Sequence, residues 1–170
     1  MRILFTEAEI AARIDEMARD IVRDLPPDFL MAPVLTGAFV FAADLLRALY
    51  RHGGDPYVDF VQLSSYGGAR SSSGVVTLLK DFSLDVSGRT ILLVDDVLDT
   101  GRSLHFGQGM IEDRGAAAVK TCVFVKKNTG HADDLVCDYI GFEAGADDYL
   151  IGYGMDDGDR KRGVPYLGAA

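Results

Sequence analysis

The residues best suited to chemistry lie near the middle of the chain, in the stretch ILLVDDVLDTGRS at residues 91–103. Asp95 and Asp96 directly follow an apolar run, and Asp99 comes soon after them. Adjacent carboxylates can accept hydrogen bonds from sugar hydroxyls or from water on a hard metal ion, and Asp99 is placed to take a proton. The next residues, TGRS at 100–103, combine a glycine with two hydroxyls before a helical pattern. Backbone N–H groups at such a helix start bind anions, so this segment is typical of a phosphate site.

A strand and a helix must position these side chains. The run Ile91–Val94 is apolar throughout, which is typical of a central strand in a parallel sheet that is buried on both faces. The pattern that follows predicts a helix over Leu104–Arg114. Two aspartates at the end of a strand are also compatible with a solvated sheet edge and an ordinary helix cap. The choice between a site and an edge therefore depends on the rest of the chain.

Similar strand and helix patterns occur along the whole sequence. Periodicity predicts helices over 7–24 and 39–50, and strands over 30–35, 57–63, 75–79, 117–125 and 135–142. Thr6 and Glu9 form the pattern of a capping box before the first helix. Strands that alternate with helices predict an α/β fold with an open, mainly parallel sheet flanked by helices. Ligands bind beyond the carboxyl ends of such strands, so the loops after Leu35, Val94 and Val125 are expected to meet at one edge.

Length and composition indicate one globular domain over residues 1–170. Hydrophobic residues make up 48% of the chain and charged residues 25%, and no apolar stretch approaches the length of a membrane span. The first residues lack a secretory signal, so we expect a cytoplasmic protein that does not bind membranes. The net charge of −9 argues against nucleic-acid binding. Cys122 and Cys137 are expected to be buried free thiols, and the histidines show no metal-ligand spacing.

The segment 64–74, SSYGGARSSSG, is rich in glycine and serine. Such a segment is most often a mobile hairpin connection. Beside a phosphate site it is equally compatible with a lid that excludes water during a reaction.

The run at 91–103 closely resembles the phosphoribosyl-pyrophosphate (PRPP) motif of the type I phosphoribosyltransferases. Further segments resemble the hypoxanthine-guanine branch of that family in order and spacing: Leu35–Phe39, Ser64–Gly67, Leu78–Asp81, Ile140–Phe142 and Gly152–Tyr166. The resemblance covers nearly the whole chain. It implies the type I fold, with a small hood formed by the terminal segments. It also implies magnesium-dependent transfer of ribose 5-phosphate from PRPP to N9 of hypoxanthine, and of guanine, with release of pyrophosphate.

The resemblance assigns a role to each part of the expected site. Asp99 becomes the catalytic carboxylate that faces N7 of the purine, as a proton acceptor or an electrostatic partner. Lys127 donates a hydrogen bond to the 6-oxo group, unless a register shift of one residue gives that role to Lys126. Tyr149 stacks on the purine, and the backbone carbonyl of Leu150 reads its exocyclic edge.

The remaining roles concern PRPP and the metal. The ribose and its 5′-phosphate are assigned to Asp95, Asp96, Thr100, Gly101, Arg102 and Ser103. Pyrophosphate is assigned to Thr36, Gly37 and Arg162, and the flexible loop includes Ser65 and Tyr66. Mg²⁺ is assigned to Asp156, with a second ion near Asp95 and Asp96.

Two features depart from the family pattern. Thr36 stands where the family usually carries Lys or Arg, in a loop with a non-proline cis peptide, so pyrophosphate binding here loses a cation but keeps its backbone contacts. The segment Gly145–Asp148 is one residue longer and more acidic than usual. The preference among hypoxanthine, guanine and xanthine therefore stays open.

Two alternatives to this interpretation remain. One is a xanthine-preferring enzyme of the same family. The other is a non-catalytic regulator that keeps the phosphoribosyl site to sense nucleotides and binds RNA. The acidic balance argues against RNA, and the presence of Asp99, Lys127 and Asp156 argues for catalysis. The family also implies a homodimer or a homotetramer.

Overall fold

The computed structural model describes residues 1–66, 75–130 and 135–170. Within these residues the helices are α1 (Glu7–Asp24), α2 (Phe39–Arg51) and α3 (Arg102–Asp113). The strands are β1 (Arg2–Phe5), β2 (Leu30–Leu35), β3 (Tyr57–Val58), β4 (Val61–Tyr66), β5 (Val75–Lys80), β6 (Thr90–Leu98), β7 (Ala118–Lys127), β8 (Tyr139–Ala144), β9 (Leu150–Ile151) and β10 (Leu167–Ala169). None of the helices formed by the described residues is both long and apolar enough to span a membrane.

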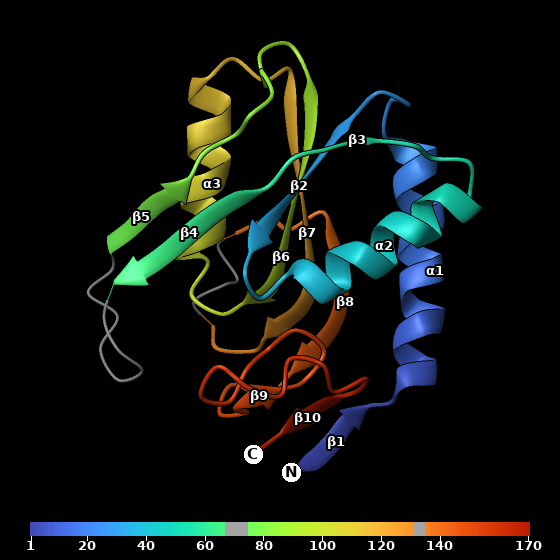
Figure 1. Cartoon of the computed structure of the whole chain (residues 1–170), viewed down its shortest axis with the longest axis vertical. Coiled ribbons are helices and arrows are strands. Elements are labelled where there is room, and N and C mark those ends of the chain that lie inside the picture. The colour runs from blue at the N-terminus through green and yellow to red at the C-terminus, as the bar shows by residue number, and fades with distance from the viewer. Residues whose placement is uncertain (67–74, 131–134) are drawn as a thin grey trace.

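A central sheet with the order β5-β4-β2-β6-β7-β8 organises the molecule, and β3 pairs with β2 beside β4. The pairs from β4 through β2, β6 and β7 to β8 are parallel, and only β5 runs antiparallel to its neighbour β4. Helices α1 and α2 cover one face of the sheet and α3 covers the other (Figure 1). The predicted open, mainly parallel sheet flanked by helices is therefore confirmed.

Strand β6 is apolar at successive positions because it faces a core on each side. Leu92 and Val94 belong to the cluster that α1 and α2 close, and Ile91 and Leu93 belong to the cluster under α3. All four side chains are fully buried. Alternation along a strand with two covered faces therefore produces the continuous apolar run seen in the sequence.

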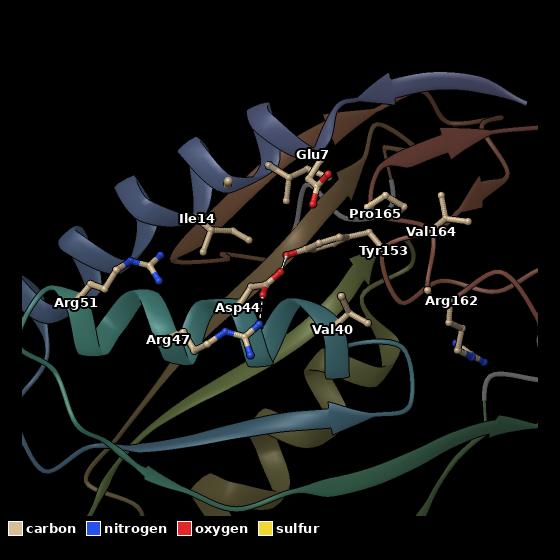
Figure 2. A pocket seen from close by; sticks show the side chains of 13 residues that line it. Glu7, Ile14, Val40, Asp44, Arg47, Arg51, Tyr153, Arg162, Val164 and Pro165 are labelled. Atoms are coloured by element: carbon tan, nitrogen blue, oxygen red, sulfur yellow. Dashed lines mark hydrogen bonds and ion pairs between the residues drawn. The ribbon is translucent and has the colours of Figure 1, made fainter.

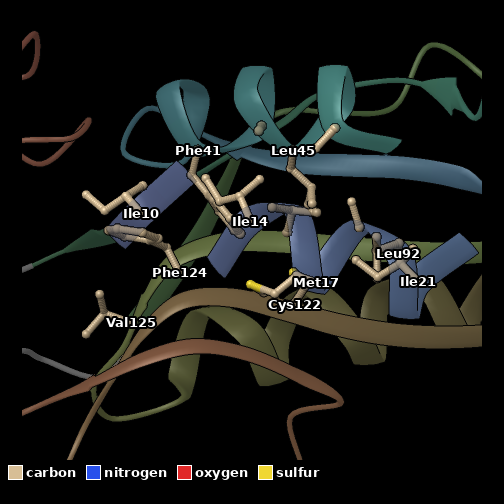
Figure 3. Packing of buried hydrophobic residues seen from close by; sticks show 14 of the residues in the cluster. Ile10, Ile14, Met17, Ile21, Phe41, Leu45, Leu92, Cys122, Phe124 and Val125 are labelled. Atoms are coloured by element: carbon tan, nitrogen blue, oxygen red, sulfur yellow. The ribbon is translucent and has the colours of Figure 1, made fainter. Parts of the chain in front are cut away.

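The larger cluster lies between the sheet and the helix pair α1 and α2 (Figure 3). Phe41 of α2 and Phe124 of β7 meet with their ring centroids 5.3 Å apart. At the start of α1, Thr6 accepts a hydrogen bond from the Glu9 backbone N–H, while the Glu9 carboxylate accepts one from the Thr6 N–H. The capping box is therefore confirmed, and the apolar stripe of α1 faces the core as its spacing predicts.

The two ends of the chain form a second, small sheet with the order β1-β10-β9. Both neighbouring pairs are antiparallel. This hood lies beyond the carboxyl ends of β6, β7 and β8, and the N- and C-termini lie side by side on it (Figure 1). The expected hood from the terminal segments is confirmed.

Strand β6 extends further than the apolar run predicts. It continues to Leu98, because Val97 and Leu98 remain paired with Val125 and Lys126 of β7. Asp95 and Asp96 are therefore strand residues, and the expected break after Val94 is wrong. The two carboxylates therefore lie within β6, near its carboxyl end.

The strand predicted over 57–63 is instead two strands. Asp59, which is buried, separates β3 from β4, and its carboxylate accepts hydrogen bonds from the backbone N–H groups of Ser83 and Leu84. These bonds tie the loop after β5 to the sheet. The prediction of a single strand is wrong because the buried Asp59 carboxylate interrupts the pairing to bind the backbone of the neighbouring loop.

The last predicted strand also begins later than expected, at Tyr139 and not at 135. The Asp138 carboxylate accepts bonds from the backbone N–H and the hydroxyl of Thr121, so the chain joins the ladder only after this anchor. Cys122 is buried and Cys137 is half-buried, and both are free thiols. The predicted burial of Cys137 is therefore only partly correct.

Candidate active site

Asp95 and Asp96, near the carboxyl end of β6, form the floor of the candidate site. Asp95 is 8% exposed, and its carboxylate accepts a hydrogen bond of 2.9 Å from the Asp96 backbone N–H. The Asp96 carboxylate accepts one of 2.8 Å from the Val97 N–H. Burial, reinforced by the negative charge of Asp96, raises the pKa of the Asp95 carboxyl well above its usual range. Hydroxyl donors or a cation against this pair would favour its ionised form.

A pocket with a volume of about 230 Å³ lies where β6 passes into α3. Gly101 is the N-cap of α3 with φ +80°, a conformation that favours glycine. A Cβ at this position would lie 2.3 Å from the Leu135 side chain. The pocket is lined by Val76, Asp95, Val97, Leu98, Asp99, Thr100, Gly101, Arg102, Ser103 and Leu104. The structure thus gathers the predicted phosphate segment around a concave helix start, which suits an anion.

The loop between β2 and α2 approaches the same floor. A Cβ added to Gly37 would lie 1.8 Å from a carboxylate oxygen of Asp96, so a side chain at this position would force that carboxylate or the loop to move. The peptide bond between Leu35 and Thr36 is cis, so the non-proline cis peptide that the resemblance implies for this loop is present. The segment Thr36–Gly37 and the β6 carboxylates therefore meet at one edge of the sheet, as the α/β pattern predicts.

Asp99 lies beyond the end of β6 and faces the end of β7. The Lys127 Nζ is 3.6 Å from its Oδ2, and the Thr129 hydroxyl donates to its backbone carbonyl over 3.1 Å. Alternation along β7 directs Lys126 to the opposite face of the strand. Of the two lysines that the sequence leaves open, Lys127 is the one beside Asp99.

The hood supplies the second group of charged side chains. An Arg162 Nη lies 3.0 Å from Asp156 Oδ1, and the other Nη donates to the Gly154 carbonyl over 2.7 Å. The Asp159 backbone N–H donates to Asp156 Oδ2 over 2.8 Å. The two residues that the resemblance assigns to metal and pyrophosphate are thus brought together on one turn.

Tyr149 and Leu150 lie at the start of β9. Tyr149 is 53% exposed, whereas Leu150 is buried and its strand pairs with β10. A buried core aromatic is therefore excluded for Tyr149, whose ring is free to stack on a ligand. In the long acidic segment before it, Asp148 accepts from the Gly145 N–H and pairs with the exposed Arg2 of β1, so this carboxylate links two segments at the surface of the hood.

Sequence reasoning missed the link between the hood and α2. The Tyr153 hydroxyl donates a hydrogen bond of 2.5 Å to Asp44 Oδ2, and Asp44 also pairs with Arg47. These residues line a second pocket of about 390 Å³ between α1, α2 and residues 162–165 (Figure 2). A tyrosine between two glycines was the only local signal, and its partner lies far away in the sequence.

Part of the expected site falls outside the described residues. Ser65 and Tyr66, which the resemblance assigns to the flexible loop, are instead the last residues of β4 and pair with Val76 and Val75 of β5, so that assignment is wrong for their backbone. The rest of the expected loop, at 67–74, lies outside the described residues. His131 also lies outside the described residues. Within the described residues, no group of three or more His, Cys, Asp or Glu side chains is arranged to hold a metal ion.

Comparison with known proteins decides the family. The sequence model of the phosphoribosyl transferase domain matches residues 3–157. The chain belongs to the phosphoribosyltransferase family. A hypoxanthine-guanine phosphoribosyltransferase of Aquifex aeolicus is 36% identical over 167 residues, which cover 97% of this chain and 92% of that protein. One from Bacillus subtilis is 34% identical over 170 residues, covering 98% and 91%.

Solved structures of phosphoribosyltransferases show the same fold. The hypoxanthine phosphoribosyltransferase of Trypanosoma cruzi, in complex with the product IMP, superposes with a TM-score of 0.89 at 34% identity, over 99% of this chain and 93% of that one. A hypoxanthine-guanine phosphoribosyltransferase of Bacillus anthracis has a TM-score of 0.89 at 32% identity, over 100% and 98%. The family and fold predicted from residues 91–103 and the other motifs are therefore confirmed.

Proposed function

We propose that this protein is a purine-salvage enzyme that transfers ribose 5-phosphate from PRPP to N9 of hypoxanthine, and of guanine, releasing pyrophosphate. The observation that carries the proposal is the Asp99–Lys127 pair beside the phosphate pocket. A carboxylate and an ammonium 3.6 Å apart match a flat base that carries a ring N–H next to a keto oxygen. The named activities of the relatives, and the product bound in the Trypanosoma cruzi structure, support this choice.

Each end of the site would bind one part of the substrates. The N–H groups and hydroxyls of residues 100–103 would hold the 5′-phosphate, and Asp95 and Asp96 would accept hydrogen bonds from the ribose hydroxyls. The purine would stack on Tyr149. This arrangement would place N9 of the base against C1 of the ribose and leave the pyrophosphate facing Thr36, Gly37 and Arg162.

The reaction forms the N9–C1 bond and breaks the bond between C1 and the pyrophosphate oxygen. The Asp99 carboxylate would accept the proton of the purine N7–H, or oppose the positive charge that develops on the ring. The Lys127 ammonium would donate to the 6-oxo group and disfavour adenine, whose amino group is itself a donor. Arg162 would meet the charge of the departing pyrophosphate.

The acidic side chains also fit Mg²⁺. The candidate ligands are carboxylate oxygens, and a site in which one or two carboxylates act together with substrate phosphates is typical of this ion. Asp156, next to Arg162, would hold one ion against the pyrophosphate. Asp95 and Asp96 would face a second ion at the ribose hydroxyls. When bound, magnesium neutralises the negative charge of the leaving pyrophosphate.

Replacing Lys127 tests how the base is selected. For Lys127→Met we expect kcat/KM for hypoxanthine to fall about tenfold or more, because the 6-oxo group loses a charged donor. Lys126→Met is the matched control, and we expect it to stay within about threefold of the wild type, since alternation directs it away from Asp99. The reverse pattern, measured by steady-state kinetics, would move the assignment to Lys126.

An absorbance assay tests the activity itself. Purified protein with PRPP and magnesium is offered hypoxanthine, guanine, xanthine, adenine and uracil separately. We expect conversion of hypoxanthine and guanine but not of adenine or uracil. Preferential conversion of xanthine would replace the proposed substrate, and nucleotide binding without conversion of any base would favour a regulator.

The family resemblance also bears on assembly and location. We infer that the chain acts in the cytoplasm as a homodimer or homotetramer, with PRPP and a 6-oxopurine as its partners. A solved structure that concerns the oligomeric state of the Trypanosoma cruzi enzyme superposes with a TM-score of 0.90 at 34% identity. Sedimentation of the purified protein measures its oligomeric state directly.

A further inference from the structure

The hood segment that carries the candidate metal ligand has an unusual backbone. Gly152, Tyr153 and Gly154 follow one another with φ values of +95°, +49° and +97°. A Cβ on Gly154 would lie 2.5 Å from the carbonyl oxygen of Gly37. The segment therefore turns sharply, and its backbone lies directly against the loop between β2 and α2, which contains Thr36 and Gly37.

The Tyr153 side chain points away from that loop, toward α2 (Figure 2). Its ring is buried against Phe124, with the centroids 4.7 Å apart. Its hydroxyl donates to Asp44 over 2.5 Å. Burial, followed by the hydrogen bond to the Asp44 carboxylate, raises the pKa of the Tyr153 hydroxyl well above its usual range, so the group remains a donor at working pH.

This bond joins two elements that each carry part of the pyrophosphate half of the site. Asp44 belongs to α2, which begins directly after Thr36 and Gly37. On the other side, Tyr153 is followed by Gly154, whose carbonyl accepts a bond from Arg162. Arg162 in turn pairs with Asp156. A continuous chain of contacts therefore runs from α2 to the side chains expected to meet pyrophosphate and magnesium.

The purine half of the hood is held differently. β9, which carries Leu150, pairs with β10 through Ile151 opposite Gly168 and Leu150 opposite Ala169. The Ala170 backbone N–H donates to the Tyr149 carbonyl over 3.0 Å. These backbone bonds do not involve Tyr153, so the two halves of the hood have separate anchors.

We propose that the hydrogen bond between Tyr153 and Asp44 is a positioning device for the pyrophosphate half of the site, which sets Asp156 and Arg162 against the loop Thr36–Gly37. The inference rests on the proposed function. The bond matters more in this chain because Thr36 supplies no positive charge to the pyrophosphate. Arg162 has to supply that charge, so its position is more important. Neither residue touches the substrates, and both act through the hood segment.

The test is Tyr153→Phe, which removes the hydroxyl and keeps the buried ring. We expect KM for PRPP, and the inhibition constant of pyrophosphate, to rise about tenfold through loss of a bond to a charged acceptor. KM for hypoxanthine is expected to stay within about twofold of wild type. Tyr139→Phe is the matched control, because it removes another hydroxyl that donates to an aspartate, Asp24, between β8 and α1. It should change none of these constants.

Variants of Asp44 test the same bond from its other end. The Asp44 side chain is 38% exposed, so we expect α2 to tolerate Asp44→Ala. This variant therefore tests the bond even if Tyr153→Phe fails to fold. We expect Asp44→Ala to match Tyr153→Phe, and Asp44→Asn, which keeps an acceptor oxygen, to restore most of the affinity for PRPP.

The outcomes separate this inference from the proposed function. An active wild type whose Tyr153→Phe and Asp44→Ala variants keep the wild-type KM for PRPP overturns the positioning device alone. Equal losses for PRPP and hypoxanthine, accompanied by a lower melting temperature, would also overturn it, because they indicate a merely structural bond. A wild-type protein that neither converts a purine nor binds PRPP overturns the proposed function, and this inference with it.

Discussion

Asp99→Asn is expected to lower kcat for hypoxanthine by between about 100-fold and 10,000-fold, the range that a positioned acid or base contributes. The amide has nearly the shape of the carboxylate but carries no charge and cannot take the purine proton. Affinity for the nucleotide product should remain largely intact, because the proposed contacts to ribose and phosphate are made by other residues that line the pocket. Single-turnover kinetics and nucleotide titration measure the two effects separately.

A matched control for Asp99→Asn is Asp20→Asn. Asp20 lies on α1, where it is exposed and pairs with Arg23, and such surface pairs contribute little to stability. The control removes one carboxylate of the same kind and should leave kcat unchanged. An Asp99→Asn enzyme with near wild-type turnover would show that this carboxylate is not the catalytic group.

Gly37→Ala is expected to lower kcat/KM for PRPP by about 100-fold, because displacements of about an ångström in a reacting site have effects of this size. The new Cβ would lie 1.8 Å from an Asp96 carboxylate oxygen, a distance that no packing can accept. Asp96 is held in place by the backbone N–H of Val97. Either this carboxylate or the loop between β2 and α2 must therefore move.

The control for Gly37→Ala is Gly109→Ala, on the outer side of α3. A Cβ there meets no atom within 4 Å. We expect activity to be unchanged and the free energy of unfolding to rise by about 0.5–1 kcal/mol, as for an exposed helical glycine. Thermal unfolding of both variants shows whether the loss in Gly37→Ala is local. Wild-type kinetics for Gly37→Ala would contradict the close approach of the loop to Asp96.

The hood illustrates how far sequence reasoning reaches. Its strands β9 and β10 have only 2 and 3 residues, too few to produce a period. The sequence predicts a hood of terminal segments only through the family resemblance, and it predicts neither of these strands. β10 pairs with β1 on one side and with β9 on the other, so this sheet depends on contacts between the two ends of the chain, and the pair Arg2 and Asp148 is another of these contacts. Such long-range partners leave no local pattern.

The end of β6 and the split between β3 and β4 also depend on long-range partners that leave no local pattern in the sequence. Apolar periodicity reports which side chains a strand buries, so it located the core of β6 correctly. It could not show that β7 keeps Val97 and Leu98 in the ladder. Nor could it show that buried Asp59 serves the backbone of the loop at Ser83 and Leu84.

The sequence by itself determined the α/β class, the helix α1 with its cap, the buried central strand and the family. Each of these follows from local periodicity or from a contiguous motif. Tertiary structure decided which lysine stands beside Asp99, how closely Gly37 approaches Asp96 and how Tyr153 joins the hood to α2. Each of those facts is a distance between atoms from separate elements. Only the packing of the sheet against its helices and hood brings those atoms together.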